Sequence, residues 1–257
     1  MTNIHPSAVV HEGARLGADV EIGPYSVVGP NVRLGDRTKI MPHVFLDGET
    51  TLGADCTVFP FASIGSRTQD LKYRGGKTYV EIGDGTTLRE YVTVNCGTAD
   101  GEVTRVGSCC HIMAYCHVAH GSRVGNGVIM ANGASLSGEV LVEDEATIGG
   151  MTGVHQFTRI GRMAMVGGMS RITQDVPPFM LVEGNPAAAH GINSVKLQRA
   201  NVPADTQAVL KKAFKLLYRQ GLSTSQAVER MRAELTLCPE IEHLLDFIAK
   251  SERGILR

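Results

Sequence analysis

The sequence contains no tryptophan, and aromatic residues of all kinds make up only 5% of its 257 residues. Neither charge is in surplus, because 25 basic and 26 acidic residues give a formal net charge of -1. A nucleic-acid-binding protein normally shows a basic surplus, so we expect no nucleic-acid partner. No run of about 18 apolar residues occurs, so we expect no transmembrane helix and no stable membrane insertion. The first residues lack the basic start and apolar core of a signal peptide, so we expect a cytoplasmic protein.

Cysteine is sparse as well, and the six cysteines include no CxxC pair. In a chain of this length without a secretory signal, reduced thiols in a cytoplasm are the simplest interpretation. Glycine, by contrast, is abundant: 30 residues, about 12% of the chain against a usual ~7%. Many turns and few bulky aromatics indicate a repetitive backbone with a narrow interior.

Aliphatic residues recur every six positions from Ile4 to Ile172. Of the 29 positions on this period, 26 hold Ile, Leu, Val or Met, and the exceptions are Asp70, Gly76 and Asp100. A period of six is typical of a hexapeptide β-helix and fits neither a helix nor an amphipathic strand. It resembles the left-handed kind, in which three hexads form one triangular coil with aliphatic residues inside and small residues at the corners. We therefore predict a mainly β fold, a left-handed parallel β-helix of hexapeptide repeats, with coils stacked about 4.8 Å apart.

The period fails in two polar, glycine-rich segments, which we predict to be loops projecting from the prism at about 65–81 and 95–105. Loops on a rigid scaffold commonly carry function. The period ends at the prolines of the QDVPPF segment, and helical spacing of apolar residues replaces it. The sequence therefore predicts a β-helix over residues 1–190 and a carboxy-terminal α-helical domain over residues 191–257.

Because one coil contains 18 residues, three polar residues are expected to lie near the same edge of the prism. His120, Glu139 and His155 fall near that edge on three successive coils, and His117 lies in the first of them. Histidine is the natural general base near neutral pH, so the group favours a catalytic site. A single histidine on such a surface is usually only a solvated polar residue, and that interpretation stays open for each one alone.

A metal site is the rival interpretation of this region, because thiols and imidazoles are close in sequence. The candidates are Cys109, Cys110, His111, Cys116, His117 and His120. Their spacing fits no familiar tetrahedral set, and alternation between inward and outward positions would separate the side chains. We therefore predict no metal. No nucleophile elbow, phosphate-binding loop or dinucleotide fingerprint occurs, so a covalent or nucleotide-cofactor mechanism has little support.

Several longer motifs are similar to those of one enzyme family. They are QDLKY (69–73), the HVAH run that ends at His120, VHQF within 148–157, QDVPPF (174–179), EGNPA and GIN. Together they resemble the UDP-N-acetylglucosamine O-acyltransferases of lipid A biosynthesis, over essentially the whole chain. The resemblance implies a cytoplasmic homotrimer with active sites between neighbouring prisms and without a metal or redox cofactor. It also implies transfer of a 3-hydroxyacyl chain from acyl carrier protein to the glucosamine 3-hydroxyl of UDP-N-acetylglucosamine, the first step of lipid A biosynthesis.

The resemblance also implies roles for individual residues. His120 matches the general base that takes the proton of the sugar hydroxyl before direct attack on the thioester. Gly150 matches the residue whose backbone N–H meets the oxyanion, a donor that need not reorganise in a rigid coil. The other matches are Asp70 and Lys72, which grip the nucleotide sugar; His155 and Gln156, which line the site; Asn193 and Arg199, which contact uridine and phosphate; and Gly168, at the position of the family's chain-length stop. Because Gly168 has no side chain to block a groove between prisms, we expect a fairly long acyl chain. His117, close to His120 in sequence, is our candidate for a substitute base.

Four positions depart from the family pattern. Gly121 stands where many members have an Asp after the catalytic histidine, so another group must orient the imidazole. Asn95 and Glu139, our remaining candidates for substrate binding, stand where histidine is common. Ala200 stands where a second Arg is common beside Arg199. These changes leave open whether the acceptor carbon of the sugar carries oxygen or nitrogen.

Other functions also stay open at this point. A related acyltransferase could use a 3-amino-sugar nucleotide, and the same prism could be a non-catalytic trimeric binding module. An acetyl-CoA-dependent acetyltransferase or a hexapeptide carbonic anhydrase could share the repeat. The QDLKY and VHQF motifs favour the family above. Its acidic carrier protein would suit a basic stripe of Lys211, Lys215 and Arg219, although an ordinary solvated helix face explains that stripe equally well.

Overall fold

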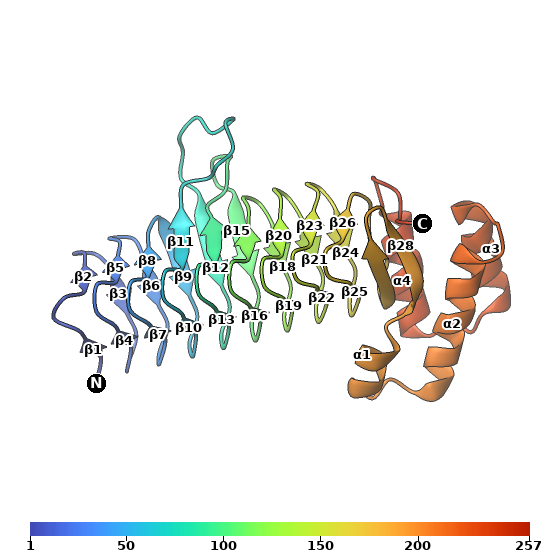
Figure 1. The fold of residues 1–257 in the computed structure, drawn as a ribbon, viewed down its shortest axis with the longest axis horizontal. Coiled ribbons are helices and arrows are strands. Elements are labelled where there is room, and N and C mark those ends of the chain that lie inside the picture. Colours follow the sequence, from blue (N-terminus) through green and yellow to red (C-terminus); the bar gives the residue numbers. More distant parts are fainter.

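The computed structural model describes all 257 residues and shows a left-handed parallel β-helix followed by a small helical domain (Figure 1). The predicted fold class is confirmed. Three parallel sheets, here named sheets A, B and C, form the three flat faces of the prism. No helix combines the length and the apolar character needed to span a membrane.

Each coil contributes one short strand to each sheet, in the order A, B, C. Sheet A has eleven strands: β1 (Asn3–Ile4), β4 (Glu21–Ile22), β7 (Lys39–Ile40), β10 (Thr57–Val58), β13 (Thr87–Leu88), β16 (His111–Ile112), β19 (Ile129–Met130), β22 (Thr147–Ile148), β25 (Met165–Val166), β27 (Met180–Gly184) and β28 (Ala187–Ile192). Sheet B has nine: β2 (Val9–Val10), β5 (Val27–Val28), β8 (Phe45–Leu46), β11 (Ser63–Ser66), β14 (Thr93–Asn95), β17 (His117–Val118), β20 (Ser135–Leu136), β23 (Gly153–Val154) and β26 (Arg171–Ile172). Sheet C has eight: β3 (Arg15–Leu16), β6 (Arg33–Leu34), β9 (Glu49–Leu52), β12 (Tyr79–Ile82), β15 (Val103–Val106), β18 (Arg123–Val124), β21 (Leu141–Val142) and β24 (Arg159–Ile160).

The aliphatic positions of the repeat form the core inside the prism. Val118, Leu136 and Val154 pair in register across β17, β20 and β23, and none is more than 2% exposed. The predicted column of one residue per coil is therefore confirmed. In β20, Ser135 faces outward while Leu136 is fully buried, so each two-residue strand presents one side chain to each side. The three positions at which the period fails all lie in projecting loops.

The corners of the prism differ from the prediction of small residues. At the corner between sheets A and B, successive coils carry large side chains with positive φ: Tyr25, His43, Phe61, Tyr91 and Tyr115. Their rings stack with centroids 4.9–5.2 Å apart and planes within 16° of parallel. The sheet spacing of about 4.8 Å matches the distance at which aromatic rings stack, so ring stacking offsets the backbone strain.

Two loops project from one side of the prism and lie next to each other in Figure 1. They cover residues 67–78, between β11 and β12, and residues 96–102, between β14 and β15. Both are shorter than predicted, because the four strands that flank them extend by one or two residues into the interrupted segments. A hydrogen bond of 3.2 Å between the hydroxyls of Thr68 and Thr98 ties the loops together.

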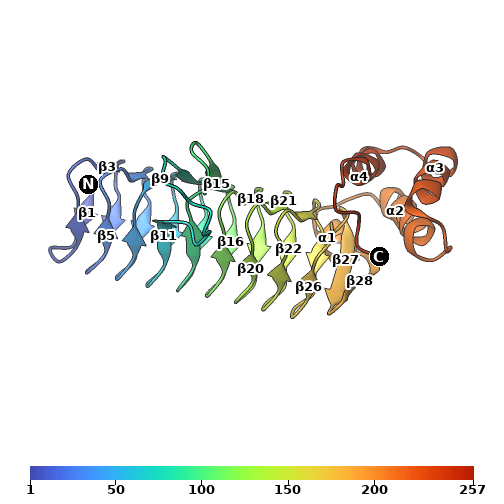
Figure 2. The same ribbon diagram turned by 90° about the horizontal axis from the view of Figure 1, so that it is seen from above.

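The helical domain covers the last coils. It consists of α1 (Ser194–Arg199), α2 (Ala204–Tyr218), α3 (Thr224–Glu234) and α4 (Pro239–Ala249), with the antiparallel β27–β28 hairpin as the transition, so sheet A reaches two residues past the predicted boundary at 190. Figure 2 shows the helices gathered at this end of the prism. α4 is joined to the coils by a hydrogen bond of 2.8 Å between His243 Nε2 and Glu143 Oε2, and by the Arg159 guanidinium 4.2 Å above the Phe247 ring. The open end of the β-helix is therefore protected.

The column of inward side chains gives a direct stability test. We expect Leu136→Ala, which truncates a fully buried side chain, to lower the free energy of unfolding by about 2–5 kcal/mol. Leu141→Ala, at the half-buried outward position of β21, is the matched control and should cost much less. Equal losses in denaturant unfolding would contradict the inward and outward assignment.

Candidate active site

His120 stands at the corner between sheets B and C, directly after β17. The backbone holds it in the coil stack, since its carbonyl accepts a 2.9 Å hydrogen bond from the Glu139 N–H of the next coil. The side chain is 20% exposed, and its ring makes no hydrogen bond within the chain. Its Nδ1 atom is buried without a partner, whereas Nε2 lies on the side of the first loop. Nε2 is therefore the ring nitrogen that a substrate could reach.

Gly138 lies in the next coil against the face of the His120 ring. A β-carbon on Gly138 would overlap Nε2 and Cε1 of His120 and lie 3.0 Å from Cδ2. The glycine therefore leaves the space that the imidazole occupies. Its backbone N–H has no acceptor within the chain, although the residue is buried. Beside the imidazole there is thus a rigid main-chain donor with no partner of its own.

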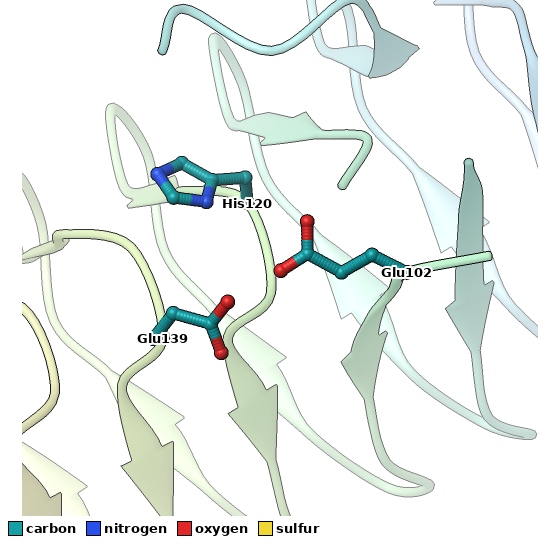
Figure 3. A group of neighbouring side chains, drawn as sticks. All are labelled: Glu102, His120 and Glu139. Atoms are coloured by element: carbon teal, nitrogen blue, oxygen red, sulfur yellow. The ribbon is translucent and has the colours of Figure 1, made fainter. Parts of the chain in front are cut away.

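Two carboxyl groups face the other side of His120. Figure 3 shows Glu102 and Glu139 with their carboxyl ends turned toward each other and the Nδ1 edge of the His120 ring facing them. One ligand atom from each of the three residues lies within 4.8 Å of the others. This spacing could accommodate a metal ion in geometry alone, so the absence of a metal stays a prediction.

The two carboxyl groups differ in protonation. Burial, the hydrogen bond to Glu102 and repulsion by its charge raise the pKa of Glu139 to about 7, although Arg123 opposes the shift. Burial would also raise the pKa of Glu102, but the hydrogen bonds from Glu139 and from the N–H groups of Thr98 and Ala99 outweigh it and lower that pKa. Below about pH 7, the two carboxyl groups together therefore carry one proton and one negative charge.

The first loop brings Asp70 to the same place. Its Oδ2 lies 3.7 Å from His120 Nε2, and its Oδ1 accepts a 2.9 Å hydrogen bond from the Lys72 N–H. That backbone hydrogen bond, with a smaller contribution from His120, lowers the pKa of Asp70 against the effect of burial. The Lys72 side chain itself is exposed. The loop therefore presents the Asp70 carboxylate to Nε2 of His120.

His117 and Asn95 lie close by on sheet B. His117 Nδ1 is 2.7 Å from the Thr93 hydroxyl, and burial together with the neighbouring His120 lowers the pKa of His117. Asn95 is buried, and only its amide nitrogen has a partner, the Ser66 carbonyl at 3.4 Å. Its Oδ1 is buried with no donor, so it can accept a hydrogen bond from a ligand.

The other residues expected at the site lie further along the prism or on other corners. His155 and Gln156 are on the same B–C corner, after β23, and both are exposed. Gly150 and Gly168 lie on the A–B corner instead, one coil apart, with the position of a Gly168 β-carbon 3.8 Å from the Gly150 nitrogen. The Gly150 N–H also has no acceptor in the chain. One chain alone therefore does not bring Gly150 or Gly168 to His120.

Asn193 and Arg199 belong to α1 and line a separate cavity of about 710 Å³. Asn193 is buried and holds its place by donating to the Met163 carbonyl at 2.9 Å and accepting from the Lys196 N–H at 3.2 Å. The prism side of this cavity is formed by Ile129, Thr147 and Met165 of sheet A, so the cavity lies on the outer face of that sheet. Its exposed cation, Arg199, suits an anionic ligand.

Sequence reasoning did not assign roles to Glu102, Gly138 or Thr93. A signal existed for two of them, because Glu102 and Gly138 stand 18 residues before and after His120 and so fall in its column. Thr93 pairs with His117 across a loop, which breaks the 18-residue count.

Family models match two parts of the chain. The model described as Udp N-acetylglucosamine O-acyltransferase, Domain 2, matches residues 175–256. The model described as Bacterial transferase hexapeptide (six repeats) matches residues 13–48 and 104–138.

Full-length relatives and solved structures agree with these matches. The chain is 46% identical over its whole length, and the whole length of the relative, to the acyl-(acyl-carrier-protein)–UDP-N-acetylglucosamine O-acyltransferase of Thiobacillus denitrificans. It is 47% identical, again with full coverage of both chains, to the protein of the same name from Verminephrobacter eiseniae. The crystal structure of a UDP-N-acetylglucosamine acyltransferase from Bacteroides fragilis superposes with a TM-score of 0.97 at 40% identity, and covers 99% of this chain and 100% of that one.

Proposed function

The chain belongs to the acyl carrier protein-dependent UDP-N-acetylglucosamine O-acyltransferase family, and we propose that His120 is the general base of its reaction. It is an O-acyltransferase of the first step of lipid A biosynthesis, with acyl carrier protein as donor and UDP-N-acetylglucosamine as acceptor. The finer proposal is that a 3-hydroxyacyl chain passes to the glucosamine 3-hydroxyl. The observation that carries it is the His120 ring, fixed between coils with Nε2 free on the side of the Asp70 loop.

His120 Nε2 would take the proton of the sugar hydroxyl, which is a weak nucleophile at neutral pH. The alkoxide oxygen then attacks the thioester carbonyl carbon, and the carbon–sulfur bond breaks as the tetrahedral intermediate collapses. The imidazolium returns its proton to the departing thiolate of the carrier protein. Asp70 and Lys72, on the loop above Nε2, would hold the sugar so that its hydroxyl points at the imidazole.

The oxyanion of the intermediate needs a hydrogen-bond donor close to the base. The Gly138 N–H fits this need, because it is free and its residue touches the His120 ring. Gly150, the donor expected from the family resemblance, lies on another corner of the same chain. Its role stays a prediction, and it requires Gly150 of a neighbouring copy to approach His120.

Three separate parts of the molecule carry the expected machinery: His120 on the B–C corner, Gly150 and Gly168 on the A–B corner, and Arg199 on α1 beside the face of sheet A. These parts can form a single site only where copies of the chain meet. An exposed apolar stripe along the A–B corner supports such contact, since Tyr25, Phe61, Tyr91, Tyr115, Met151 and Met169 are all at least 44% exposed. The proposed assembly is a homotrimer with sites between neighbouring prisms.

Both substrates are acidic, and each would meet a surface with basic residues. The α1 cavity offers Asn193 and Arg199 to the uridine and phosphates of the acceptor. On α2, Lys211, Lys215 and Arg219 are exposed on one face, which suits an acidic carrier protein. The free Oδ1 of Asn95 would accept from a sugar O–H or N–H alike, so a 3-amino-sugar acceptor is the second candidate.

We expect His120→Ala to lower kcat by about 10²–10⁴-fold, because a positioned general base contributes that much. The effect on KM for the sugar nucleotide should be smaller. His117→Ala is the matched control and should cost less, since its Nδ1 is already engaged by Thr93. The assay uses acyl carrier protein thioesters with the hydroxyl and amino forms of the sugar nucleotide, and turnover of each identifies the acceptor. Near-normal kcat in a folded His120→Ala protein, or a larger loss in His117→Ala, would overturn the assignment.

Gly138→Ala tests the room beside the imidazole. The new methyl group would displace the His120 ring, so we expect kcat to fall by about 10–100-fold with the fold intact. Gly153→Ala, in the neighbouring strand β23, is the control, because nothing lies within 4 Å of its β-carbon position. Equal kcat values for the two variants would show that the ring does not depend on this glycine.

Light scattering tests the assembly. We expect a mass three times the 27.5 kDa of the chain. Mixing His120→Ala subunits with Gly168→Met subunits tests whether a site combines residues from two copies. If it does, some sites in a mixed trimer will contain both an intact His120 and an intact Gly168, and turnover of the long-chain substrate should exceed that of either variant alone. A fully active monomer would exclude a shared site.

A further inference from the structure

The proposed function leaves Glu102 and Glu139 without a task, although both lie against the catalytic imidazole. We infer that these two side chains share one proton and act as a single carboxylate unit that holds the Nδ1–H of His120 and so directs Nε2 toward the substrate. Both are positioning residues, because they act through His120. The inference rests on the proposed role of His120 as general base.

Gly121 provides the space for the pair. Its φ is +65°, and a β-carbon there would lie 2.5 Å from Glu139 Oε1 and closer still to Glu102 Oε1. The two carboxyl groups therefore fill the volume that any side chain after His120 would need. A glycine at position 121, in place of the family's acid, is therefore what allows Glu102 and Glu139 to approach each other beside His120.

Each member of the pair is held from a different direction. Glu102 Oε2 accepts hydrogen bonds from the Thr98 and Ala99 N–H groups of the second loop, which leaves Oε1 toward Glu139. Glu139 is fixed at the end of β20, where its N–H donates to the His120 carbonyl at 2.9 Å. Figure 3 shows both carboxyl ends meeting beneath the Nδ1 edge of the ring. The pair is thus pinned by a loop on one side and by the coil stack on the other.

His120 needs an acceptor at this position. Nδ1 is buried and has no other partner, and a buried N–H without an acceptor is unfavourable. One carboxyl oxygen of each glutamate lies within 4.8 Å of a His120 ring nitrogen, and Figure 3 shows the Nδ1 edge of the ring turned toward them. An Nδ1–H bound to a carboxylate fixes the tautomer in which Nε2 has the lone pair.

The charge of the pair changes near neutral pH. The pKa of Glu139 is about 7, raised by burial and by Glu102, so below this pH the pair holds one proton and one negative charge. Two adjacent carboxyl groups titrate as a unit, and above pH 7 the pair gains a second negative charge. The other titratable groups that face the cluster are Asp70 from the first loop, His117 from β17 and Arg123 from β18.

Three variants isolate the pair: Glu102→Gln, Glu139→Gln and the double variant. Each single variant keeps one carboxylate, because the remaining acid ionises or stays ionised beside the new amide. We expect each to lower kcat about fivefold or less, and the double variant to lower it about 50-fold or more, beyond the product of the single losses. KM for the sugar nucleotide should change less than kcat. Glu81→Gln, which removes an exposed carboxylate paired with Arg105 on sheet C, is the control.

The pH profile separates orientation from mere structural support. The acidic limb of kcat/KM reports loss of the proton from His120, and nearby negative charge raises the pKa of an imidazolium. Below the Glu139 pKa of about 7, the wild-type pair carries one negative charge, as does each single variant, whereas the double variant carries none. The limb should therefore lie at a similar pH in the wild type and the single variants, and at a lower pH in the double variant.

Several results would overturn the inference. One is a folded double variant whose kcat stays within threefold of the wild type. Another is an acidic limb at the same pH in the double variant as in the wild type. If the double variant does not fold, a loss of kcat well beyond fivefold in either single variant contradicts a shared carboxylate unit. A third is loss of wild-type activity in EDTA with recovery on adding Zn²⁺ or Mg²⁺, which would mean that the cluster holds a cation rather than a proton. His120→Ala distinguishes the two levels of argument: if it is inactive while the double variant is normal, the base stands and only the pair fails.

Discussion

The narrow interior of the prism is the constraint on which the rest of the structure depends. One branched aliphatic side chain per hexad fills each face, so every coil must have the same width and stack at the sheet spacing of about 4.8 Å. Where no loop intervenes, this makes two residues of the β-helix that are 18 apart neighbours, as Val118 and Leu136 are. The proposed base His120 and the proposed donor Gly138 share this geometry, since they stand one coil apart on one corner. Their separation is set by the stacking and needs no loop movement, which is the preorganisation that an oxyanion site requires.

The loops supply what a regular stack cannot, namely charges above the corner. Asp70 comes from the first loop and reaches His120 Nε2, and the second loop holds Glu102 through two N–H groups. The Thr68–Thr98 hydrogen bond joins these loops. A substrate that binds Asp70 therefore contacts the same connected unit that holds Glu102. If the sugar binds Asp70 as proposed, its position and the surroundings of the imidazole are linked through two loops, while His120 itself lies on the rigid coil stack.

The sequence predicts those parts of the site that lie within the six-residue repeat, and it does not predict the parts that lie outside the repeat. Val118, His120 and Glu139 lie inside the repeat, so counting by 18 predicted their neighbourhood, and the same count would have found Gly138 and Glu102. Asp70 lies in a loop without a period, and only the family resemblance pointed to it. The corner residues were predicted wrongly, because the repeat shows which positions turn but not that ring stacking stabilises tyrosine there. Distances between different corners depend on neighbouring copies, which no pattern within one chain describes, so the role of Gly150 stays a prediction.

The positions of Glu102 and Glu139 beside His120 explain two of the departures from the family pattern together. Gly121 and Glu139 looked like two separate losses near the pocket, an acid after the base and a histidine beside it. In the structure the space left by Gly121 contains the carboxyl groups of Glu139 and Glu102, so a carboxylate still faces His120 Nδ1. These two departures therefore concern how the base is oriented, on the side of the ring away from Nε2. Asn95 is different, because it is buried with a free acceptor atom and makes no contact with the carboxyl pair. Of the changed positions, Asn95 is the candidate for recognising the oxygen or nitrogen at the acceptor carbon of the sugar. That choice of acceptor would not depend on which groups orient His120.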